Sequence, residues 1–167
     1  NPQLKFLVVS ASKDRADNFS TFTMRLINEM PILAPLRPED TQRNSKISFD
    51  VGPSSADHAP SVKSQGVLGQ MAGSRADEVI ADDVEVPNNS FTQPMRDKLS
   101  EAVKEFDAIL KPNGKITFLG TPQTEQSLYL TLEERGYTTR IWTARYPEIK
   151  NNYGDRLAPK LAQRLAE

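Results

Sequence analysis

The sequence predicts an α/β fold, a largely parallel sheet flanked by helices. Short apolar runs recur along the 167 residues, as buried strands do. Stretches with helical periodicity separate several of these runs. Three runs end in small or acidic residues, which is typical of strands that lead into βα turns. We find no internal repeat and expect one domain, because a chain of this length can fold around a single core.

The expected strands differ in how far they are buried. Residues 5–9 and 78–81 are mostly apolar, which favours strands covered on both faces. Residues 47–51 alternate between apolar and polar side chains, which favours a half-buried strand. In all, strands are expected at residues 5–9, 47–51, 62–68, 78–81, 116–119 and 138–142.

The first expected helix follows the strand at residues 5–9. Ser12 can cap it, and Asp14 suits the positive end of its dipole. Residues 31–45 then form a proline-rich polar connection, and residues 52–60 a turn-rich loop. The inward face of this helix is expected to consist of Ala16, Phe19, Phe22 and Leu26, at steps of three and four.

A second helix is expected at residues 91–110, after a loop at residues 87–90. Pro112-Asn113-Gly114 is expected to end it, because these residues favour helix C-termini. Two more helices are expected at residues 124–135 and 155–166, and Trp142 should pack in or near the core. The inward residues of the second helix are expected to be Met95, Leu99, Val103, Phe106 and Leu110.

The composition excludes several classes of protein. There are 21 Lys and Arg against 22 Asp and Glu, so a strongly basic nucleic-acid-binding domain is excluded and any such contact must be local. The absence of Cys excludes disulfides, thiolate zinc sites and cysteine nucleophiles, and a single His58 excludes paired-histidine metal sites. No apolar run of about 18 residues and no signal peptide is present. We therefore expect a soluble protein of the cytoplasm.

The most suggestive segment runs from Val79 to Glu85. Its apolar residues end in Asp82 and Asp83, which matches the Walker B pattern of P-loop NTPases. In that pattern the first acid holds Mg²⁺, directly or through water. The next acid orients or deprotonates the attacking water. An ordinary strand that runs into an acidic turn is the alternative interpretation.

Two further segments could serve a phosphate site. Gly120 and Thr121 follow the strand at residues 116–119, where a small turn and a hydroxyl can approach a phosphate, as in helicase-like ATPases. Arg75 precedes the acidic strand and offers a planar fork for phosphate, as an arginine finger does. However, neither G-x-x-x-x-G-K-[ST] nor G-x-G-x-x-G occurs, so the backbone cradle for phosphates is missing from this sequence.

Three segments together resemble one family. They are V-V-S-A-S-K-D-R-A-D at residues 8–17, G-S-R-A-D-E-V-I-A-D-D-V-E-V-P-N-N-S at residues 73–90 and F-L-G-T-P-Q-T-E at residues 118–125. They closely resemble the large terminase subunits of T7-like bacteriophages, and the similarity extends over most of the chain. The resemblance implies a DNA-packaging motor with an N-terminal ATPase domain of the ASCE (RecA-like) P-loop class and a C-terminal nuclease domain.

The resemblance also implies roles for individual residues. Asp82 would be the Walker B ligand of Mg²⁺, and Asp83 stands where these proteins usually place a catalytic glutamate. Since Asp83 is shorter, Glu85 can share or take that role. Thr121, after Gly120, would lie in the motif that couples hydrolysis to movement, and Arg75 would reach a γ-phosphate, often that of a neighbouring subunit.

The same resemblance implies the cofactors, partners and location. ATP and Mg²⁺ would be bound, and double-stranded DNA would be driven into the procapsid. The partners would be DNA, the portal protein, the small terminase subunit and further copies in a homo-oligomeric ring. The protein would act in the host cell cytoplasm, without a membrane.

Residues 1–167 are expected to be part of the N-terminal ATPase domain, with the nuclease domain absent. The Walker A strand and helix would precede Asn1, so the isolated chain is expected to bind nucleotide weakly and to be inactive. Two other functions fit the residues. One is a metal-dependent phosphoesterase or nuclease that uses Asp82, Asp83 and Glu85 as a metal cluster. The other is a non-catalytic binding module of the same fold.

Overall fold

The computed structural model describes residues 1–148, 151 and 153–166. The chain divides into two compact units, an N-terminal unit (Asn1–Leu128) and a C-terminal unit (Tyr129–Glu167). The sequence of the N-terminal unit holds 14 Lys and Arg against 17 Asp and Glu, a net charge of −3. That of the C-terminal unit holds 7 against 5, a net charge of +2.

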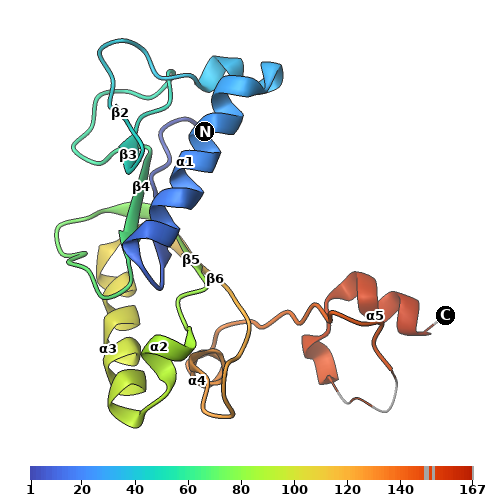
Figure 1. The fold of residues 1–167 in the computed structure, drawn as a ribbon. Helices are drawn as coiled ribbons and strands as arrows, with labels where there is room; N and C mark the ends of the chain where they lie inside the picture. The colour runs from blue at the N-terminus through green and yellow to red at the C-terminus, as the bar shows by residue number, and fades with distance from the viewer. Residues whose placement is uncertain (149–150, 152, 167) are drawn as a thin grey trace. The chain divides into compact units, whose positions relative to one another are not determined.

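A six-stranded sheet forms the centre of the N-terminal unit, in the order β2-β3-β4-β1-β5-β6 (Figure 1). Four neighbouring strands, β4, β1, β5 and β6, run parallel to one another, whereas β3 pairs antiparallel with β4 and β2 antiparallel with β3. The α/β class is therefore confirmed, and the sheet is mixed. The strands are β1 (Phe6–Ser10), β2 (Asn44–Ser45), β3 (Ser48–Phe49), β4 (Val62–Gly66), β5 (Ala76–Asp82) and β6 (Leu110–Leu119).

The first helix, α1 (Lys13–Glu29), is capped as the sequence predicts. The side chain of Ser12 accepts a hydrogen bond from the backbone N–H of Arg15 at 3.4 Å. The predicted inward face is wrong at Phe22, which is 61% exposed. Ala16 is buried as predicted. The other buried residues are Ser20 and Ile27, so the face that packs on β1 and β4 is rotated from the one that the aromatic residues suggest. Residues 31–36, within the expected connection, form a 3₁₀ helix.

Two helices, α2 (Pro87–Ser90) and α3 (Gln93–Ile109), follow β5. The first of them replaces the predicted loop. In α3, four residues are buried, namely Leu99, Val103, Phe106 and Ile109, and the prediction is wrong for Met95, which is exposed. The ring of Phe106 stacks on Phe118 of β6 with centroids 5.8 Å apart, which fixes α3 against the sheet.

The residues expected to separate α3 from the next strand lie inside β6. The strand begins at Leu110, directly after the helix, and includes Pro112 and Gly114. A register shift between β5 and β6 near Ala76 accommodates them, and Asn113 takes a left-handed φ of 65°. The break in regularity that the sequence signals is therefore an irregularity in the pairing of β6 with β5, within the bounds of the strand.

The C-terminal part of the chain contains α4 (Leu128–Glu134), a 3₁₀ turn η2 (Gly154–Arg156) and α5 (Pro159–Ala166). The predicted strand at residues 138–142 is wrong, because only an isolated bridge joins Ile141 to Leu157. The predicted helix at residues 155–166 is divided into η2 and α5. Trp142 is 66% exposed in this structure and not part of the core.

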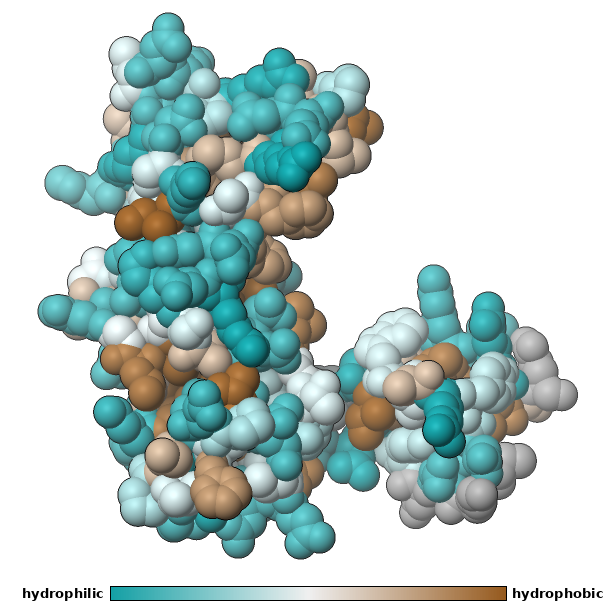
Figure 2. Space-filling view, in the orientation of Figure 1, coloured by the Kyte–Doolittle hydropathy of each residue, from teal (hydrophilic) through white to brown (hydrophobic). Residues whose placement is uncertain are grey.

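The surface is mostly hydrophilic on the face shown in Figure 2, with apolar residues in separate patches. The large apolar side chains that are exposed are Leu4, Phe22, Met30, Ile32, Ile47, Leu68, Phe91, Met95, Leu119, Leu130, Trp142 and Tyr146. Within the described residues, no helix combines the length and the hydropathy that crossing a membrane requires.

Candidate functional site

The three strand ends singled out in the sequence meet at one edge of the sheet. Ser10 at the end of β1 pairs with Asp82 at the end of β5, and Asp82 pairs with Leu119 at the end of β6. Because these strands are parallel, the segments that follow them leave the sheet on the same side. In α/β proteins this carboxyl edge is where ligands bind.

Asp82 and Asp83 lie in the middle of this edge, which we call the acidic edge. Asp82 is half-buried and Asp83 is exposed. Asp83 has a left-handed φ of 46°, and its N–H donates to the carbonyl of Leu119 at 2.9 Å, which ties the end of β5 to β6. Burial, together with the negative charge of Asp83, raises the pKa of Asp82, and the guanidinium of Arg15 offsets part of that rise.

Asp82→Asn is expected to raise the thermal midpoint of the metal-free chain at pH 7. Since folding raises the pKa of Asp82, its stabilising contribution is complete below its ordinary value of 3.8 and is lost as pH rises through the folded value. At pH 7 the ionised carboxylate therefore opposes folding, and an amide does not. Thermal unfolding at pH 7 and pH 3 measures this. The gain should disappear at pH 3, and the exposed control Asp107→Asn should show none. Equal midpoints at pH 7 for Asp82→Asn and the parent chain would contradict the expectation.

Glu85 lies apart from the other two acids. Its side chain is only 2% exposed, and both carboxylate oxygens accept hydrogen bonds from the segment after β6. Oε1 accepts from the N–H of Gln123 at 3.0 Å, and Oε2 accepts from the hydroxyl of Ser127 at 3.1 Å and from the N–H of Leu128 at 2.5 Å. These contacts favour a structural role for Glu85, which joins the turn after β5 to the segment after β6.

The turn after β6 is exposed at Gly120 and Thr121. The side chain of Gln123 donates to the carbonyl of Thr121 at 3.0 Å, and the N–H of Gln123 reaches Glu85. The turn therefore lies beside the acidic strand end and is held through Gln123. The Thr121 side chain is exposed to solvent, as a ligand-binding hydroxyl needs to be.

Arg75 lies at the opposite end of β5. It immediately precedes Ala76, the first residue of that strand, whereas Asp82 is the last. A strand of seven residues spans about 20 Å, so the two side chains do not share one site. The guanidinium of Arg75 donates to the carbonyls of Ser74 at 3.0 Å and Ala108 at 3.4 Å.

Arg15 is a residue at the acidic edge that the sequence analysis did not select. It lies in the first turn of α1, close enough to Asp82 to affect its pKa. Part of the signal was present in the sequence, because the Ser12 cap places the first turn of α1 directly after β1. The pairing of β1 with β5 is known only from the structure.

The acidic edge suits Mg²⁺ held by the pair Asp82 and Asp83, but it does not form a three-acid metal cluster with Glu85. Two adjacent carboxylates suit Mg²⁺, which in phosphate sites takes one or two protein carboxylates and fills its other positions with phosphate and water. The raised pKa of Asp82 also shows a cost of negative charge that a cation would relieve. Among the described residues, no group of three or more acids or histidines could hold a metal, so the cluster with Glu85 that a phosphoesterase would need does not form.

Comparison with known proteins relates the chain to a phage protein. The chain is 56% identical over 169 residues to the terminase large subunit of Enterobacteria phage T3. The match covers 98% of this chain and 29% of that subunit, so the chain spans less than a third of the length of this relative. No family model matches the chain. The resemblance carried by residues 8–17, 73–90 and 118–125 is confirmed by this identity.

Proposed function

Because the chain is related along almost its whole length to the large terminase subunits of T7-like phages, we propose that it is part of a DNA-packaging motor. It would contribute the acidic edge of an ATPase domain of the P-loop class, which drives double-stranded DNA into the procapsid. Its partners would be DNA, the portal protein, the small terminase subunit and further copies of itself, in the host cytoplasm.

The observation that carries the proposal is the meeting of Asp82, Asp83 and Thr121 at one edge of the parallel strands. Asp82, at the end of the central strand β5, would hold Mg²⁺. When bound, Mg²⁺ neutralises the charge on the phosphates of ATP. Asp83, exposed beside it, would orient the attacking water, and the buried contacts of Glu85 favour Asp83 over Glu85 for this task.

Gly120 and Thr121 would sense the state of the nucleotide. Their turn is joined through Gln123 to Glu85, and Glu85 follows the acidic strand end by two residues. A change at Asp83 would therefore reach the turn after β6 through a short series of hydrogen bonds. The phosphate cradle, which this sequence lacks, would come from another part of the intact subunit.

Arg75 would act on a nucleotide held by another copy. Since about 20 Å of β5 separates it from Asp82, it cannot serve the site of its own chain in this conformation. This geometry supports a ring in which copies complete one another's sites.

ATP hydrolysis by the intact subunit tests the proposal. Asp82→Asn and Asp83→Asn are each expected to lower the rate about hundredfold, since each removes a charge that acts on the reacting groups. Asp107→Asn, the same change at an exposed position of α3, should leave the rate within about twofold of the parent. If both acidic-edge variants hydrolyse ATP at the parent rate, the roles given to Asp82 and Asp83 are wrong. An intact subunit that does not hydrolyse ATP would contradict the ATPase assignment and favour a non-catalytic module of this fold.

A further inference from the structure

A second candidate site lies at the amino ends of the parallel strands, away from Asp82. It is a pocket of about 430 Å³ in the N-terminal unit. Its wall includes Asp57 and His58 from the loop before β4, Lys63 of β4, Arg75 at the start of β5 and Lys111 of β6. Cavities of this size hold ligands as large as a nucleotide.

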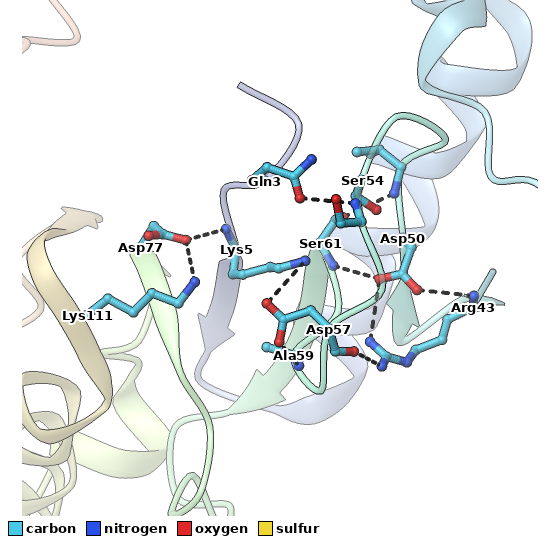
Figure 3. Close-up of polar contacts among 12 residues, drawn as sticks. Gln3, Lys5, Arg43, Asp50, Ser54, Asp57, Ala59, Ser61, Asp77 and Lys111 are labelled. Carbon is cyan, nitrogen blue, oxygen red and sulfur yellow. Dashed lines mark hydrogen bonds and ion pairs between the residues drawn. The ribbon is translucent and has the colours of Figure 1, made fainter.

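The charges around this pocket do not balance. Lys111 is paired with Asp77 at 3.0 Å, and Lys5 lies 3.9 Å from Asp57 (Figure 3). Within each of these two pairs the positive and negative charges cancel. Lys63 donates to the hydroxyl of Ser74 at 3.1 Å, and Arg75 donates to two backbone carbonyls. Within the described part of the chain, neither Lys63 nor Arg75 has an ion-pair partner, so the pocket keeps an excess of two positive charges.

Lys5 contributes to the positive character of this pocket from a buried position. Its side chain is 2% exposed, and its ammonium makes no hydrogen bond among the described residues. Figure 3 shows the side chain directed away from Asp77 and toward Asp57, which lines the pocket. A buried ammonium without hydrogen bonds is costly. Here it offsets the charge of Asp57, the carboxylate in the pocket wall that would otherwise repel an anion.

We propose that this pocket binds a phosphate group through Lys63 and Arg75. The guanidinium of Arg75 can present two parallel donors to phosphate oxygens, and the ammonium of Lys63 adds a second charged donor. The phosphate would come either from the backbone of DNA or from a nucleotide held by another copy. These two sources rest on the proposed function, whereas the phosphate chemistry rests on the pocket alone.

The test titrates the 167-residue chain without Mg²⁺ with inorganic phosphate, ATP and a short DNA duplex, and follows the backbone amide signals by NMR. Saturable shifts are expected around Lys63 and Arg75. Lys63→Gln, which can still donate to Ser74, should weaken binding at least about tenfold because a charged donor is lost. Lys98→Gln is the matched control, the same charge change on the exposed face of α3, and should leave binding within about twofold.

The three probes distinguish the sources of the phosphate. Tighter binding of the duplex, with strong salt dependence, identifies the DNA backbone, and tighter binding of ATP identifies a nucleotide. The same two variants in the intact subunit, with DNA and ATP as probes, repeat the comparison independently of the stability of the isolated chain. No saturable shifts around Lys63 and Arg75 in the 167-residue chain, or equal weakening by both variants, overturns the proposal. Because the titration involves no turnover, failure of ATP hydrolysis would not affect its result.

Discussion

Replacing Glu85 with alanine is expected to destabilise the chain by about 3–5 kcal/mol, because three hydrogen-bond donors lose their acceptor in a buried place. Each unsatisfied buried donor costs about 1–3 kcal/mol, and the loss of one buried carboxylate offsets part of the total. Urea unfolding measures the difference. Hydrogen exchange at the amides of Gln123 and Leu128 should accelerate in the variant, which locates the effect.

Two further variants make this expectation specific. Glu85→Gln keeps one acceptor but turns an amide group toward donors, so an intermediate loss is expected. Glu105→Ala removes an exposed glutamate of α3 and should cost less than about 0.5 kcal/mol. If Glu85→Ala unfolds at the same urea concentration as Glu105→Ala, the structural role is wrong, and a catalytic role for Glu85 regains support.

Phe106→Ala is expected to cost about 3–5 kcal/mol, since the ring is fully buried and its removal leaves a cavity between α3 and β6. The stacking on Phe118 is lost as well. Urea unfolding again provides the measurement, and Phe106→Leu should lose much less because it fills most of the space.

The matched control for Phe106 is Phe91→Ala, which removes the same side chain from a position that is 80% exposed. It should change stability by less than about 0.5 kcal/mol. Similar losses for the two phenylalanines would show that α3 does not pack on the sheet as described.

The parts of the fold that the sequence predicts are those governed by local patterns. The apolar runs at β1 and β5 end in polar residues at the sheet edge, so the strands and the position of Asp82 and Asp83 could be read directly. The buried face of α1 could not be predicted in full from its sequence. Phe22 favours one side of the helix by hydropathy, but the space against β1 and β4 accepts Ser20 and Ile27 beside the predicted Ala16. The close approach of two elements decides which side chains fit, and periodicity does not contain that information.

The rest of the candidate site depends on contacts between distant residues. Glu85 and its partners are 38 to 43 residues apart, so its sequence position beside two other acids suggested a shared metal site that the fold does not form. Arg75 is seven residues before Asp82, which looks close in sequence but spans a whole strand. The excess positive charge at the amino ends combines Lys63 of β4 with Arg75 from the loop before β5, and no local motif signals this combination.

The two units carry net charges of opposite sign, which affects the electrostatic interaction of the chain with a polyanion. The isoelectric point of about 6.0 describes the whole chain, whereas the net charge is −3 in the N-terminal unit and +2 in the C-terminal unit. At physiological salt, electrostatic interactions decay over about 8 Å. A DNA phosphate that approaches the C-terminal unit therefore experiences the cations of its immediate surroundings and not the net −1 of the whole chain. If the chain binds DNA as proposed, the attraction would be a local property of the surface, and adding salt should weaken it without any change in the overall charge.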